Sequence, residues 1–127
     1  MANQAKILLF NVNNDRQLSI EKLCRSLSAS VSVSAIRPSM YMQSMWYLAG
    51  IMGFEKKNTS YTGSDFDSEM LVFSGIYQTL MDEFLESMKK AGVFPVALKA
   101  IITPTNIFWT PKQLYDELCQ EHRAFHC

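Results

Sequence analysis

Residues 95–113 read Pro-Val-Ala-Leu-Lys-Ala-Ile-Ile-Thr-Pro-Thr-Asn-Ile-Phe-Trp-Thr-Pro-Lys-Gln, and this stretch decides the fold prediction. The apolar run from Val96 to Ile102 lies between two prolines, and such a short run predicts a strand that is buried on both faces. A helix then begins with clear signals: Thr110 caps it, Pro111 suits its first turn, and Gln113 completes a Thr-x-x-Gln capping box. This stretch therefore predicts one strand followed by one helix.

The same alternation of strand and helix extends through the rest of the chain. Apolar runs at 6–12, 31–36 and 70–73 predict three further strands, and apolar residues at helical spacing predict a helix after each of them. The second of these helices is expected to begin at Pro38 and to end at Gly50 or Gly53.

This alternation predicts an α/β fold, a small three-layer, doubly wound and mainly parallel sheet of four strands with helices on both faces. We expect the strand order 2-1-3-4. The alternative is a ferredoxin-like α+β sheet, which would arise if the connection at 54–68 let the third strand pair in the opposite direction.

The composition suits one domain over residues 1–127, since 127 residues with 48% hydrophobic side chains can bury a single core. Residues 54–68 follow neither the helical nor the strand period, and a connection of this length is unusual in a compact domain. We predict a flexible loop there, and the sequence leaves open whether it is a functional lid or a disordered insertion.

The charge pattern disfavours several classes of partner. The 12 basic and 12 acidic side chains cancel without forming long blocks, which argues against a nucleic-acid partner. No apolar run is long enough for a membrane helix, and no signal peptide is evident, so we expect a cytoplasmic protein. The chain has no phosphate-binding, dinucleotide-binding or nucleophile motif, so no cofactor is expected.

Polar side chains follow the predicted strands where a ligand site would form. In open parallel sheets, ligands bind beyond the carboxyl ends of the strands, where the strand order reverses. For the order 2-1-3-4 this crevice would lie between strands one and three. Its rim would offer hydrogen bonds to a small polar ligand or a peptide, unless these side chains only build tight turns. The candidates are Asn11, Asn13, Asn14, Asp15, Ser74, Gly75, Thr103, Thr105 and Asn106.

Two further residues near the fourth strand are candidates. Lys99 interrupts an apolar strand, so it is either a desolvated amine of lowered pKa or, as is more common, a lysine that reaches past the sheet edge or pairs with a carboxylate. Trp109 lies in an apolar cluster that either staples the last helix to the body or forms an exposed contact patch.

The C-terminus holds the one constellation that resembles a metal site. Cys119, His122 and His126 are spaced i, i+3, i+7, and their donor atoms suit zinc. The site would lie at a chain end without a familiar ligand spacing, so we do not predict a metal. The cysteines are expected to be reduced thiols.

The chain also resembles the bacterial domain-of-unknown-function family numbered 3783. The segments that carry the resemblance are 7–12, 47–51, 70–75, 81–85, 96–106, 109–110 and 113–118. The family has no activity to carry over. The resemblance implies only that a signature block of this family is matched by Lys99, Thr103, Pro104, Thr105, Asn106 and Trp109, and that residues 56–68 match it least.

Three functions remain from these observations. The first is a cytoplasmic regulatory module that binds a ligand or a protein through the loop from Thr103 to Trp109, with a homodimer as one form of partnership. The second is an uncharacterised enzyme that uses Lys99 with Asn106 or Asp15. The third is a metal-binding protein that uses the C-terminal cluster.

Overall fold

The structure is a computed structural model that describes residues 5–28, 30–50, 61, 63–93 and 95–121. Within these described residues, four strands and four α-helices alternate, with two short 3-10 helices between them. In chain order the elements are β1 (Lys6–Phe10), α1 (Asn14–Leu27), β2 (Ser32–Ile36), η1 (Pro38–Met40), α2 (Met45–Leu48), β3 (Met70–Ser74), α3 (Gln78–Lys90), β4 (Leu98–Ile101), η2 (Asn106–Phe108) and α4 (Pro111–Glu121).

The four strands form one mixed sheet in the order β2-β1-β3-β4. The pairs β1–β2 and β3–β4 are parallel, whereas β1 and β3 are antiparallel. The predicted strand order and the mainly parallel α/β class are therefore confirmed. The difference from a fully parallel sheet lies in the central pair alone.

The central pair, β1 and β3, is antiparallel because β3 begins at the same end of the sheet at which β2 ends. Phe10, the last residue of β1, pairs with Ile36 at the end of β2 and with Met70 at the start of β3. The carboxyl ends of β1 and β2 therefore lie at one end of the sheet, and those of β3 and β4 lie at the other. We call these the β1–β2 end and the β3–β4 end.

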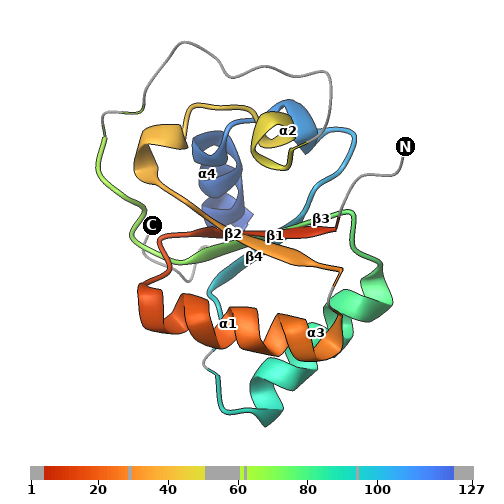
Figure 1. Cartoon of the computed structure of the whole chain (residues 1–127). Helices are drawn as coiled ribbons and strands as arrows, with labels where there is room; N and C mark the ends of the chain where they lie inside the picture. The colour runs from red at the N-terminus through yellow and green to blue at the C-terminus, as the bar shows by residue number, and fades with distance from the viewer. Residues whose placement is uncertain (1–4, 29, 51–60, 62, 94, 122–127) are drawn as a thin grey trace.

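Helices cover both faces of the sheet, as Figure 1 shows with α1 and α3 below it and α2 and α4 above it. Successive residues of a strand point to opposite faces. In β1, Leu8 and Phe10 accordingly join the core beneath α2 and α4, whereas Ile7 and Leu9 join the core beside α1 and α3. All five residues of β3 are buried, which explains its unbroken apolar sequence.

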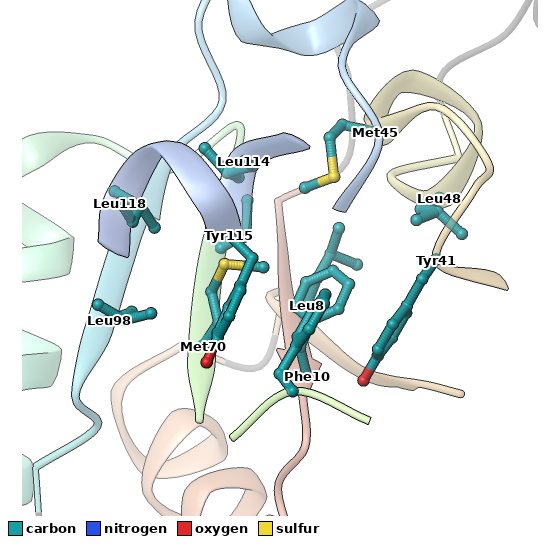
Figure 2. Packing of buried hydrophobic residues seen from close by; sticks show 12 residues of the cluster. Leu8, Phe10, Tyr41, Met45, Leu48, Met70, Leu98, Leu114, Tyr115 and Leu118 are labelled. Atoms are coloured by element: carbon teal, nitrogen blue, oxygen red, sulfur yellow. The ribbon is translucent and has the colours of Figure 1, made fainter. Parts of the chain in front are cut away.

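Aromatic rings fill much of the core on the α4 side. Figure 2 shows Tyr115 of α4 and Tyr41 on either side of this cluster, with Phe10 and Leu8 between them. The ring of Phe66, which is 6% exposed, stacks on both Tyr41 and Tyr115 with centroid distances of 4.1 Å. Phe66 therefore joins the residue that follows η1 to α4 across this face.

Phe66 belongs to the segment 54–68 that was predicted to be a flexible loop. Residues 54–60 and 62 lie outside the described residues. At the end of the segment, Phe66 is buried, and the backbone N–H of Ser68 donates to the Tyr115 hydroxyl at 3.0 Å. Phe66 in this polar stretch is thus a core residue.

The helix predicted from Pro38 to Gly50 or Gly53 is wrong as one continuous element, and Gly53 lies outside the described residues. The chain forms η1, then a turn, and then the single turn of α2. Ser44 caps α2 by accepting a hydrogen bond from the Tyr47 backbone N–H at 3.2 Å. Serine competes for helix backbone groups through its hydroxyl, so it starts a new helix here instead of continuing one. Among the described helices, none has the length and apolar character needed to cross a membrane.

Candidate ligand-binding cleft

The antiparallel central pair separates the residues that the sequence predicted to form one crevice. Asn11, Asn13 and Asp15 follow β1 and lie at the β1–β2 end. Ser74 ends β3 beside Lys6, at the start of β1, so it lies at the opposite end together with the loop after β4. The predicted crevice between the carboxyl ends of strands one and three is therefore wrong, because those two ends are on opposite sides of the sheet.

Asn11 adopts a left-handed backbone conformation, with φ of 58°, immediately after β1. Asparagine tolerates this region better than most residues other than glycine. The sharp turn directs its side-chain Nδ2 to the backbone carbonyl of Phe66, to which it donates a hydrogen bond of 2.7 Å. Asn11 thereby ties the end of β1 to the segment that precedes β3.

The N-terminus of α1 opens beside Asn11. The side chain of Asn13 accepts a hydrogen bond from the Arg16 backbone N–H at 2.9 Å, which makes Asn13 the N-cap of the helix. The Arg16 guanidinium then binds the Glu69 carboxylate through two hydrogen bonds of 2.6 and 3.0 Å. That contact raises the pKa of Arg16 and holds the start of β3 beside α1.

Tyr41 and Asp65 also lie at the β1–β2 end, where Asp65 lines the cleft. The buried Tyr41 hydroxyl donates to Asp65 Oδ1 at 2.5 Å, and the same oxygen accepts from the Phe66 backbone N–H at 2.8 Å. Burial first, and then the hydrogen bond to Asp65, raises the pKa of Tyr41 far above its ordinary value. Tyr41 is therefore a neutral donor that orients the Asp65 carboxylate, and it is not a proton-transfer group near neutral pH.

These elements surround an open cleft of about 670 Å³ at the β1–β2 end. Its walls come from the turn between β1 and α1, the first turns of α1, the residues after β2, and Asp65. Leu9, Ala35 and Ile36 add apolar surface. The polar residues that line it are Asn11, Asn13, Asn14, Gln17, Arg37 and Asp65.

The cleft combines donors, acceptors and both signs of charge. Arg37 supplies guanidinium N–H donors, and Asp65 supplies a carboxylate whose Oδ1 is already held by Tyr41 and by the backbone. The N-terminus of α1 adds the positive end of a helix dipole. This arrangement can hold a small polar molecule through several hydrogen bonds without requiring a high net charge.

Sequence reasoning found Asn11, Asn13 and Asn14 but missed Gln17, Arg37 and Asp65. Arg37 directly follows β2, and the rule that ligands bind at the carboxyl ends of parallel strands could have identified it if it had been applied to strands one and two. Gln17 lies one turn into α1 and was identifiable by the same reasoning. Asp65 gave no local signal, since its position depends on how a long connection folds back.

The predicted residues at the β3–β4 end form a different arrangement. Asn106, which is 9% exposed, accepts from the Thr103 backbone N–H at 2.8 Å and donates from Nδ2 to the Ile101 carbonyl at 3.0 Å. The Thr103 hydroxyl accepts from the Asn106 backbone N–H at 3.1 Å. These side chains close the loop on itself, while Thr105 is exposed and Ser74 is buried.

Lys99 and Trp109 are also accounted for by local contacts. The exposed Lys99 donates from Nζ to the Val96 carbonyl at 2.9 Å, so its amine lies at the edge of the sheet and outside the polar cleft. Trp109 is partly buried against the core, and its carbonyl accepts from the Met45 backbone N–H at 2.8 Å. The contact joins the residue after η2 to the start of α2.

The C-terminal zinc candidates are only partly within the structure. His122 and His126 lie outside the described residues. Cys119 is disulfide-bonded, which differs from the reduced thiol expected for it, whereas Cys24 is a buried free thiol. The described part of the chain contains no group of three His, Cys, Asp or Glu side chains that could hold a metal ion.

Comparison with known families gives one match, which covers the second half of the chain. Residues 69–125 match a family described as Domain of unknown function (DUF3783). This part of the chain resembles DUF3783. The matched residues run from just before β3 through α4, so they include the Lys99 to Trp109 block. Asn11, Asn13 and Arg37 lie outside the DUF3783 match. Comparison with curated proteins gave no match, and comparison with solved structures gave none.

Proposed function

We propose that this protein is a cytoplasmic binding module that takes a small polar ligand in the cleft at the β1–β2 end. The observation that carries the proposal is the cleft itself. Its volume of about 670 Å³ falls within the range of about 300–1,000 Å³ that is typical of small-molecule sites. It also lies beyond the carboxyl ends of two adjacent parallel strands, where open α/β sheets bind ligands.

The lining supports a ligand with several hydrogen-bonding groups. Acceptor groups of the ligand would face the Arg37 guanidinium and the opening of α1, and a donor group would face the Asp65 carboxylate. An apolar ligand is disfavoured because polar residues dominate the lining. The proposed chemical class is therefore a small, polar molecule such as an amino acid, a sugar or a nucleoside.

This proposal moves the site away from the loop after the fourth strand. There, Thr103 and Asn106 already use their side chains to bond each other's backbone, so fewer groups remain for a ligand. An enzyme that uses Lys99 is also disfavoured, because Lys99 lies outside the polar cleft. The Lys99 amine is exposed beside an apolar groove formed with α3, and it does not line the polar cleft.

A thermal-shift screen against amino acids, sugars and nucleosides tests the proposal. The screen compares the wild-type protein with Gln17→Ala and Arg37→Ala, and uses Thr105→Ala at the opposite end of the sheet as the matched control. A ligand at 100 times its Kd adds about 2.7 kcal/mol of stability, enough to raise Tm by several degrees. We expect such a shift for the wild type and the control, and a reduced shift for both cleft variants.

Two results would contradict the proposal. One is that no compound of these classes raises the Tm of the wild-type protein. The other is that a compound shifts all four proteins equally, because the ligand would then bind outside the β1–β2 end.

A further inference from the structure

The two outer strands of the sheet differ in how they are protected from other chains. An edge strand exposes a row of unpaired backbone groups, and proteins commonly block it with a lysine, a proline or a very short strand. β4 has all three features. It is only four residues long, Lys99 is exposed in its middle, and Pro95 and Pro104 lie on either side of it.

β2, at the other edge, carries none of these devices within the strand itself, and Arg37 and Pro38 follow only after its last residue. Its five residues, Ser32–Ile36, include no charged side chain and no proline. The sequence has no charged residue between Arg25 and Arg37, so the approach to the strand is uncharged as well. Among the described elements, β2 has β1 as its one neighbour in the sheet.

The pairing with β1 determines which backbone groups of β2 remain open. The Ser32 N–H donates to the Ala5 carbonyl at 3.1 Å, and the register places Ser32 opposite Lys6. Backbone groups of alternate residues point to the same side of a strand, so those of Ser34 and Ile36 also face β1. The N–H and C=O groups of Val33 and Ala35 therefore face the open edge.

We propose that β2 pairs in antiparallel fashion with β2 of a second copy of this chain, around a two-fold axis near Ser34. In this arrangement Val33 of each copy lies opposite Ala35 of the other, and both contribute the backbone groups that face outward. The two sheets join into one continuous sheet. The interface is isologous, as in most homodimers, because each copy presents the same strand.

The charge distribution favours a second copy as the occupant. Because β2 has no charged side chain along its length, two copies of it meet without like-charge repulsion. In the antiparallel pair the two Arg37 side chains lie at opposite ends of the joined strands, so they do not face each other. This inference does not depend on the ligand-binding proposal.

The test measures the mass of the full-length protein by sedimentation velocity over a range of concentrations. We expect a dimer for the wild type. Val33→Pro removes an outward N–H and should give a monomer of half the mass, with an unchanged circular dichroism spectrum. Ala35→Lys copies the protective lysine of β4 onto β2 and should have the same effect, which covers the case in which the proline variant fails to fold.

Two further proline variants serve as controls. Lys99→Pro also removes an outward N–H, since the amides of Leu98 and Ile102 bond β3, but it does so at the other edge of the sheet and should leave the dimer intact. Ser34→Pro removes an N–H that faces β1 and should lower Tm. A wild-type protein that stays monomeric at every concentration overturns the proposal. So does a folded Val33→Pro or Ala35→Lys variant that remains a dimer.

Discussion

The β1–β2 end and the β3–β4 end of the sheet carry similar polar residues but use them differently. At the β3–β4 end, Asn106 and Thr103 exchange hydrogen bonds, and the loop closes around a nearly buried amide. At the β1–β2 end, Asn11 and Asn13 bond the backbone on either side of an open cleft that also contains Arg37. Residue type alone therefore does not identify a binding site. The decisive feature is whether the side chains close on one another or leave a space between them.

The largest expected effect on stability is at the closed end. Asn106→Ala removes the acceptor for the Thr103 N–H and the donor for the Ile101 carbonyl. Buried groups that lose their partners are costly, so we expect the free energy of unfolding to fall by about 2–3 kcal/mol. Urea denaturation measures this value, with Thr105→Ala as an exposed control in the same loop. Equal stability of the two variants would show that the loop is not held by Asn106.

A smaller effect is expected at the open end from Tyr41→Phe. The variant loses the hydrogen bond to Asp65, and we expect a loss of about 1–2 kcal/mol near neutral pH. Tyr77→Phe is the matched control, because Tyr77 is 82% exposed.

The pH dependence of Tyr41 sharpens this prediction. Burial and the Asp65 hydrogen bond raise the pKa of Tyr41 in the folded protein above its ordinary value of 10.0, so the folded state keeps a proton that the unfolded state loses. Stability from this group is therefore complete below about pH 10 and falls as the pH rises further. The wild type should lose about 1.4 kcal/mol per pH unit more than Tyr41→Phe in that range. Parallel curves from urea denaturation would contradict this assignment.

The smallest effects are expected from two salt bridges. The Arg16–Glu69 pair joins α1 to the start of β3 with side chains only 19% and 24% exposed, whereas the Lys112–Asp116 pair lies along α4 at 42% and 51%. We expect a coupling energy of about 1 kcal/mol for the first pair and about 0.3–0.5 kcal/mol for the second. Double-mutant cycles with Arg16→Met, Glu69→Gln, Lys112→Met and Asp116→Asn measure both. A larger coupling for the pair on α4 would reverse the ranking.

Much of the fold followed from local sequence signals. The apolar run after Pro95 became β4, and the predicted capping box is present, with the Thr110 N–H donating to the Gln113 side chain at 2.9 Å and the Gln113 N–H donating to the Thr110 hydroxyl at 3.2 Å. Capping depends on residues three positions apart, so a sequence reveals it directly. The candidate site was predicted less well. Asn11, Asn13 and Asn14 were found because they follow a strand. Arg37 was missed because the predicted crevice lay between strands one and three, and Asp65 was missed because it reaches the cleft only in the folded chain.

By itself, the sequence determined the strands and most of the helices, because periodicity and caps act over a few residues. The alternation of strand and helix then predicted the strand order. Only the tertiary structure decided the direction of β3 against β1. The connection after β2 is long enough to reach either end of the sheet, and contacts far apart in sequence select one of them. Those contacts are the Asn11 bond to the Phe66 carbonyl and the Arg16 pair with Glu69. They hold the start of β3 at the end of the sheet where β2 ends. The open cleft therefore lies at the β1–β2 end, and the closed loop after β4 lies at the β3–β4 end.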